Sequence, residues 1–87
     1  MPFLIAVYAV NQKRGGKMLR LFRRYLTWVQ NSVFEGDLTV AQFRQLQDES
    51  EAILEDEDGV VFYQLRDERY SERIVLGTDK AERSRFL

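Results

Sequence analysis

Residues 27–39 read TWVQNSVFEGDLT, and the other predicted elements are arranged around this segment. Apolar and small polar side chains alternate over residues 29–34, which is the period-two pattern of a strand in the centre of a sheet. Gly36 then lets the backbone bend or bulge. Thr39, with Gln42 three residues later, has the pattern of a helix N-cap. A central strand, a kink and a helix start are therefore expected within this one segment.

The composition is that of a single folded domain. The chain has 87 residues, of which 45% are hydrophobic and 31% are charged. A chain this short buries only a modest share of its surface alone, so we expect an oligomer. Cysteine and histidine are both absent, which excludes disulfides, the usual zinc sites and histidine acid–base catalysis. The apolar run at residues 3–10 is too short to cross a bilayer, and we expect a soluble, cytoplasmic protein without a membrane partner.

Charge is strongly segregated along the sequence, although the formal net charge is only -1. Residues 11–26 carry six cations and no acid, whereas residues 48–58 carry seven acids and no base. A basic face of this kind can meet a polyanion while the acidic face keeps the protein soluble. Two solvated helix faces are the alternative explanation of the same pattern.

The order of the remaining elements predicts the fold class. Residues 3–10 are apolar on both alternating faces and read as a central strand, and residues 11–16 read as a polar loop. From Lys17 the apolar residues follow the helical period, and residues 60–65 form a last main strand. The second helix is expected to run from Thr39 to near Glu55. The order is that of an α+β, ferredoxin-like β-α-β-β-α-β domain, in which both helices cover one face of an antiparallel sheet.

The uncovered sheet face predicts a homodimer. The first and last main strands are apolar on both faces, but two helices cover only one, and packing of two copies closes the other. Residues 66–73 are expected to be a charged linker before a short C-terminal strand that pairs with a sheet edge in the dimer. The domain then spans residues 1–77, and residues 78–87 form a mobile tail. The expected dimer residues are Tyr8, Ile74, Val75 and Leu76.

The basic segment supplies the candidate contacts to nucleic acid. A basic loop that leads into a basic helix start presents both cations and backbone amides to phosphates. The expected phosphate contacts are Lys13, Arg14, Lys17 and Arg20. No RNA-recognition aromatic motif lies on the first or last strand, which disfavours sequence-specific readout of a single strand. A regulatory dimer for a small ligand is a further alternative, but such a sensor does not need six uncompensated cations in this segment.

Three segments resemble the CRISPR-associated protein two (Cas-two) family. They are the first strand ending in Val7-Tyr8, the sequence VQNSVFEG at residues 29–36, and the sequence ERIVLG at residues 72–77. The resemblance implies a homodimer in CRISPR adaptation, the spacer-acquisition step of antiviral defence, where the family joins the Cas-one integrase and holds double-stranded DNA. It also implies an alternative function, because some members are reported as metal-dependent endonucleases, hydrolases that cut RNA or double-stranded DNA.

One position departs from that family. Its first strand usually ends in Tyr-Asp, and the two facing aspartates of the dimer are its proposed ligands for magnesium or manganese; this chain has Tyr8-Ala9. A methyl group cannot bind a hard cation that takes oxygen ligands, and the hydrolysis needs such an ion. Glu35 and Asp37 are carboxylates in or next to the sequence VQNSVFEG and are expected to be solvated. Ser32 has no base in a recognisable triad pattern. We therefore expect a DNA-holding adaptor with no assigned catalytic residue and a doubtful metal site.

Overall fold

The computed structural model describes residues 3–66 and 69–78, which form five strands and two helices. In chain order these are β1 (Phe3–Ala9), α1 (Gln12–Arg23), β2 (Thr27–Gln30), β3 (Val33–Asp37), α2 (Val40–Ile53), β4 (Gly59–Arg66) and β5 (Arg69–Gly77). The first six follow the expected ferredoxin-like order, and β5 follows as a further strand. No helix in this part of the chain is long and apolar enough to cross a membrane.

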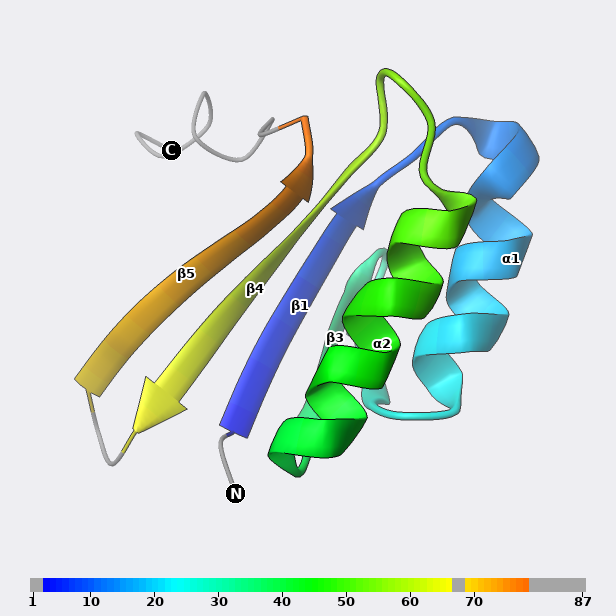
Figure 1. Cartoon of the computed structure of the whole chain (residues 1–87). Helices are drawn as coiled ribbons and strands as arrows, with labels where there is room; N and C mark the ends of the chain where they lie inside the picture. The colour runs from blue at the N-terminus through cyan, green and yellow to red at the C-terminus, as the bar shows by residue number, and fades with distance from the viewer. Residues whose placement is uncertain (1–2, 67–68, 79–87) are drawn as a thin grey trace.

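The strands form one sheet in the order β2-β3-β1-β4-β5, and every neighbouring pair is antiparallel. β1 lies in the middle, as its apolar pattern predicts. Both helices lie on the same side of the sheet (Figure 1). The α+β fold class and the antiparallel sheet expected from the sequence are therefore confirmed.

The core fills the space between the helices and this side of the sheet. Phe22 of α1 is fully buried, and its ring centroid lies 5.4 Å from that of Phe34 and 6.1 Å from that of Phe62. Phe43 of α2 meets Phe62 edge-on at 5.0 Å. Aromatic pairs of this kind add about 0.5–1.5 kcal/mol each beyond the burial of their area. The rings therefore fix both helices against β3 and β4.

Both helices begin at a polar cap. The capping box of α2 is confirmed, because Gln42 N donates to Thr39 Oγ1 at 3.0 Å and Thr39 N donates to the Gln42 side chain at 2.9 Å. The predicted loop at residues 11–16 is wrong, since α1 already begins at Gln12 and contains the glycine pair. Asn11 caps α1 by accepting from Lys13 N at 2.9 Å. This cap offsets part of the roughly 1 kcal/mol that each glycine costs in a helix.

Residues 27–34 are a hairpin and not the single central strand that the alternation suggested. β2 is the edge strand of the sheet and turns into β3 at Asn31, whose φ of 46° is tolerated by asparagine better than by most residues. The bulge lies between Trp28 and Gln30, and Gly36 stays in register opposite Leu4, so the predicted kink at Gly36 is also wrong. Gly36 instead allows a close approach, because a Cβ there would lie 3.2 Å from Leu26 Cδ2.

The predicted linker at residues 66–73 is wrong in its larger part, because β5 already begins at Arg69. β5 is longer than the expected strand and pairs with β4 of the same chain along its length, with a register shift between Gln64 and Leu65. Thr78 N donates to the carbonyl oxygen of Asp58 at 2.9 Å, so the ordered contacts extend one residue past β5. Residues 79–87, which make up nearly all of the predicted mobile tail, lie outside the described residues.

Candidate nucleic-acid interface

Helix α1 separates its apolar and cationic side chains. Met18, Leu21 and Phe22 are buried against the sheet, whereas Lys17 and Arg20 are exposed. No acid occurs in α1 to neutralise these cations. The amphipathic pattern therefore folds as predicted and presents a row of positive charge to solvent.

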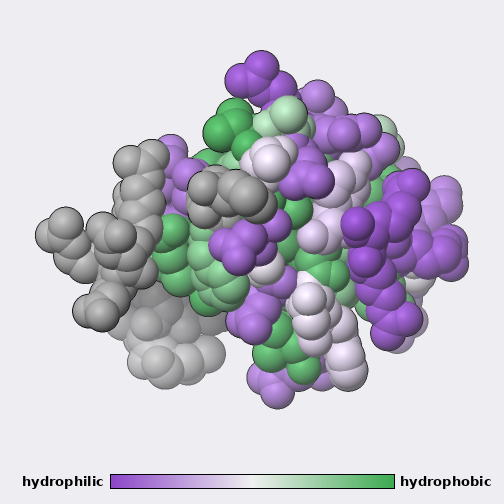
Figure 2. Space-filling model, turned by 90° about the horizontal axis from the view of Figure 1, so that it is seen from below, coloured by the Kyte–Doolittle hydropathy of each residue, from purple (hydrophilic) through white to green (hydrophobic). Residues whose placement is uncertain are grey.

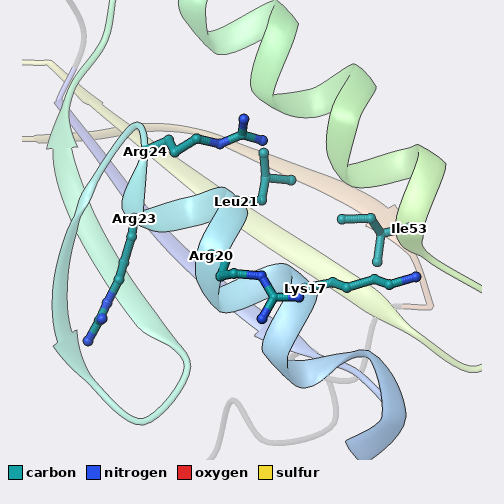
Figure 3. Close-up of a pocket in the computed structure, with 6 residues that line it drawn as sticks. All are labelled: Lys17, Arg20, Leu21, Arg23, Arg24 and Ile53. Atoms are coloured by element: carbon teal, nitrogen blue, oxygen red, sulfur yellow. The ribbon is translucent and has the colours of Figure 1, made fainter.

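A groove of about 630 Å³ runs between α1 and α2 along this row. Its lining residues are Lys17, Arg20, Leu21, Arg23, Arg24 and Ile53. Figure 3 shows Lys17 and Arg24 reaching across the groove towards α2, on either side of Leu21, while Arg23 points the other way. In Figure 2 strongly hydrophilic residues gather on the α1 side of the molecule. Four cationic residues and an apolar floor line the groove and no acid in the described part of the chain does, but the charged end of Arg23 points out of it.

One groove cation, Arg24, contacts an acid, Glu49 of α2. Its Oε1 lies 4.0 Å from Nη2 of Arg24, and the two side chains are 38% and 67% exposed. Such an exposed pair contributes little and does not hold the guanidinium against a competing phosphate. The same Glu49 oxygen accepts a 2.7 Å hydrogen bond from the Tyr25 hydroxyl, which raises the pKa of Tyr25.

The four residues predicted to contact phosphates do not all lie at one site. Lys17 and Arg20 both line the groove, and their contact with phosphates stays a prediction. Lys13 is exposed in the first turn of α1 and does not line the groove. The guanidinium of Arg14 donates to Asp58 and does not line the groove either. The sequence had placed Arg23 and Arg24 in the basic segment but not at the site. Both lie at the C-terminal end of a helix whose other face is apolar, and this pattern could have indicated that they belong to the site.

Arg14 forms an ion pair with Asp58, which is fully buried and directly precedes β4. Arg14 Nε donates to Asp58 Oδ2, and Arg14 Nη2 donates to Oδ1 at 3.1 Å. Two backbone amides complete the set, because Asn11 N donates to Oδ1 at 3.0 Å and Glu55 N donates to Oδ2 at 3.1 Å. Both carboxylate oxygens therefore accept two hydrogen bonds each.

These contacts stabilise the charged form of Asp58. The hydrogen bond from Arg14 is the largest cause, and it lowers the pKa of Asp58 to about 2 against the opposing effect of burial. The same pair raises the pKa of Arg14. Asp58 thereby ties the cap of α1 to the end of α2 and, through its carbonyl oxygen, to Thr78 after β5. Arg14 is therefore part of the hydrogen-bonded cluster around Asp58. Its geometry does not support the expectation from the sequence that its guanidinium is free to bind phosphate.

Ala9 ends β1 opposite Gly59. Since Tyr8 packs on Phe22 at 5.3 Å on the helix side, the alternation of the strand places Ala9 on the opposite, open face of the sheet. Burial raises the pKa of Tyr8, which keeps its hydroxyl protonated. Ala9 and Tyr8 together therefore offer no anionic ligand at this end of β1.

The residues around Ala9 do not fit a divalent metal. Among residues 3–66 and 69–78 there is no group of three or more acidic, histidine or cysteine side chains that could hold one. Asp58 is the neighbouring carboxylate, but both of its oxygens are already saturated. Glu35 and Asp37 pair with Ile5 and Phe3, so they lie roughly 13 Å and 20 Å along β1 from Ala9. Both are exposed, in agreement with the expectation that they are solvated.

The open face carries an apolar row across the sheet. Val33, Val7, Val61 and Val75 are neighbours in the registers of four successive strands. Of the predicted dimer residues, Val75 therefore lies on the open face. Tyr8, Ile74 and Leu76 pack against the core on the helix side of their own chain. Their role in a dimer stays a prediction.

Comparisons with known proteins agree with this fold. The family model described as CRISPR associated protein Cas2 matches residues 1–73. A protein named CRISPR-associated endoribonuclease Cas2 from Dictyoglomus turgidum is 49% identical over 98% of this chain and 99% of its own length. A relative of the same name from Methanosarcina acetivorans is 41% identical over the same shares.

Solved structures give the same result. One described as a crystal structure of cas2 superposes with a TM-score of 0.75, at 35% identity over 92% of this chain and 91% of the other. The structure of Streptococcus pyogenes Cas2 at pH 6.5 gives a TM-score of 0.67, at 31% identity over 74% and 86% of the two chains. The similarity thus spans both helices and the sheet that positions the cationic groove.

Proposed function

Because the chain belongs to the Cas2 family of CRISPR-associated proteins, we propose that it acts in CRISPR adaptation as a homodimeric adaptor that holds double-stranded DNA for the Cas-one integrase. The observation that supports the proposal is the groove between α1 and α2, which is lined by cationic residues and by no acid, and in which Lys17, Arg20 and Arg24 lie with only the exposed Arg24–Glu49 pair among the described residues to compensate them. Contacts from such cations to phosphates position a nucleic acid and carry no sequence information. The adaptor therefore binds the DNA backbone and leaves sequence choice to its partner.

The second half of the proposal is the dimer. On the open face Val7, Val33 and Val75 are only partly buried, as is Ile5 beside them, whereas Val61 is 4% exposed. The partly buried residues leave apolar surface that neither helix covers. Packing against the same face of a second copy is the simplest closure, because most soluble oligomers are symmetric homodimers. A dimer doubles the number of cationic grooves that one duplex can meet.

Endonuclease activity is the second candidate, and the names of the relatives favour it, since they are called endoribonucleases. The residues at the end of β1 weigh against it in this chain. Metal-dependent cleavage of a phosphodiester uses an ion to activate water and to stabilise negative charge, which requires oxygen ligands. Ala9 supplies none, and Asp58 is committed to Arg14. We therefore place binding ahead of cleavage.

Duplex binding is tested by its salt dependence. The dissociation constant of a blunt DNA duplex should rise steeply with salt and vary little with sequence, because counterion release dominates such binding. Replacing Arg20 by glutamine should weaken binding to every sequence alike and reduce the slope of log affinity against log salt by roughly one. Arg44→Gln is the matched control, since Arg44 is exposed on α2 and does not line the groove.

The measurement is fluorescence anisotropy of a labelled duplex at several salt concentrations, repeated with an RNA duplex of the same sequence. Equal slopes for the Arg20→Gln and Arg44→Gln variants would remove the groove from the binding surface. An affinity that does not change with salt would refute the proposal altogether. Tighter binding of the RNA duplex would favour the endoribonuclease alternative.

A further inference from the structure

Trp28 is the one tryptophan of the chain, and its side chain is 48% exposed. It lies on the edge strand β2 in register with Phe34. Cross-strand partners share a face of the sheet, and Phe34 faces the helices in the core. Trp28 therefore lies on the helix-bearing side, one strand further out than Phe34, at the margin of the cover that α1 provides.

The indole of Trp28 is held in a fixed orientation. Its Nε1 donates to the carbonyl oxygen of Asn31 at 2.9 Å, across the turn that joins β2 to β3. The polar edge of the ring is thereby satisfied, and what remains exposed is apolar ring surface. Val29 beside it is 45% exposed. Burial in the hydrophobic core does not explain why a large aromatic side chain occupies this position, because almost half of the surface of the Trp28 side chain stays in water.

The cationic side chains of α1 lead directly to this ring. Arg24 caps α1 four residues before Trp28, so their Cα atoms are at most about 15 Å apart. Arg23 points out of the groove on the side where the β2–β3 hairpin lies (Figure 3). No acid occurs between Asn11 and Phe34 in the sequence. Among the described residues, Arg24 has only the exposed 4.0 Å contact with Glu49. The acid nearest the hairpin turn in sequence, Glu35, pairs with Thr27 beside Trp28. An exposed aromatic ring next to a row of largely uncompensated cations matches the phosphates and base of a polynucleotide.

We propose that Trp28 is a stacking platform for an unpaired nucleobase, at the end of a nucleic acid whose phosphates lie on the cations of α1. This inference rests on the proposed nucleic-acid binding, and it adds that the protein recognises an unpaired end of the bound nucleic acid. A base inside a duplex has both faces stacked and a terminal pair exposes only its outer face, so an unpaired base at a single-stranded or frayed end is the one free to turn out of the duplex onto the indole. Every base has a π-face, so the contact tolerates any sequence and differs from the sequence-specific single-strand readout that the strand motifs disfavour.

The single tryptophan reports its own occupancy. Wild-type protein is titrated with a short oligothymidylate, a blunt DNA duplex, the same duplex with a single-stranded extension, and inorganic polyphosphate. The indole fluorescence should be quenched by the oligothymidylate and by the extended duplex, and should change little with the blunt duplex or polyphosphate. Equal changes with polyphosphate would show that the indole senses anions and not bases, and would overturn the proposal.

Substitution at Trp28 measures the contribution of the ring. Loss of one stacked base is expected to weaken binding about five- to hundredfold. By anisotropy of a labelled extended duplex, Trp28→Leu should fall in this range, Trp28→Tyr should recover most of the affinity, and the blunt duplex should bind both variants within about twofold of wild type. Circular dichroism checks that each variant is folded. If Trp28→Leu is unfolded, the wild-type quenching and the Trp28→Tyr variant still test the inference.

The outcomes separate this inference from the proposal on which it rests. Salt-dependent binding of the blunt duplex without quenching by single-stranded extensions overturns the role of Trp28 alone. Binding of neither duplex nor single strand overturns both. Equal affinity of wild type and Trp28→Leu for the extended duplex also rejects the platform, and it leaves the exposed ring as a surface for a protein partner.

Discussion

The buried Asp58 should make the stability of this protein fall between about pH 5 and pH 2. Its carboxylate has an ordinary pKa of 3.8 in the unfolded chain and about 2 in the folded protein. Because the folded pKa is lowered, the stabilisation is fully present above the unfolded value and is lost as the pH falls through the folded value. The shift of nearly two units corresponds to at most about 2–3 kcal/mol, at about 1.36 kcal/mol per unit.

Replacing Asp58 by asparagine should remove this pH dependence and more. The amide keeps one oxygen acceptor where the carboxylate had two, so it cannot accept from Arg14, Asn11 N and Glu55 N together. Breaking a buried ion pair from one side costs about 3–5 kcal/mol, and the partial exposure of Arg14 favours the lower end. A loss of about 3 kcal/mol lowers Tm by roughly 10–20 °C in a domain of this size.

Thermal melts followed by circular dichroism from pH 2.5 to pH 7, at one protein concentration, measure both effects. Asp56→Asn is the matched control, since it makes the same charge change two residues away at an exposed side chain, and it should change stability by less than about 0.5 kcal/mol. The difference between wild type and Asp58→Asn should shrink as the pH falls. Two results would show that the ion pair does not stabilise the fold. One is a stability difference between wild type and Asp58→Asn that does not change with pH. The other is an Asp58→Asn variant with the same Tm as the Asp56→Asn control.

Other consequences of the structure are equally open to measurement. Ala9→Asp should gain magnesium- or manganese-dependent cleavage at least tenfold above that of the present sequence on RNA or duplex DNA; equal cleavage by both would return attention to Glu35 and the other solvated acids as ligands. Ser50→Ala should raise Tm by a few degrees, because the Ser50 hydroxyl is buried without a hydrogen-bond partner among the described residues and leaving such a group unpaired costs about 1–3 kcal/mol. Val7→Glu should produce a monomer in sedimentation at micromolar protein, whereas Val40→Glu, at a 70% exposed site on α2, should leave the wild-type mass unchanged; a wild type that already sediments as a folded monomer would refute the dimer.

Features that depend on a few neighbouring residues could be predicted from the sequence. The cap of α2 at Thr39, the amphipathic period of α1 and the central place of β1 follow from local patterns, because turns, caps and periodic burial act over one or two turns of chain. The order of the elements also follows from these patterns, and the sheet confirms it. The cations Lys17 and Arg20 were identified for the same reason, since helical spacing alone places them opposite the apolar face.

Features that depend on partners far apart in the sequence were decided by the tertiary structure. Arg14 looked like a free cation until the fold brought it to Asp58, 44 residues later, where burial of the carboxylate demanded a positive partner. β5 looked like a linker and a short strand because its charged first half has no apolar pattern of its own, and pairing with β4 provides its backbone hydrogen bonds. Trp28 looked like part of a central strand, and only the hairpin turn at Asn31 moved it to the sheet edge, where its ring is exposed. Local sequence specifies the elements, but the packing of distant elements determines which charges are neutralised and which aromatic surface remains in solvent.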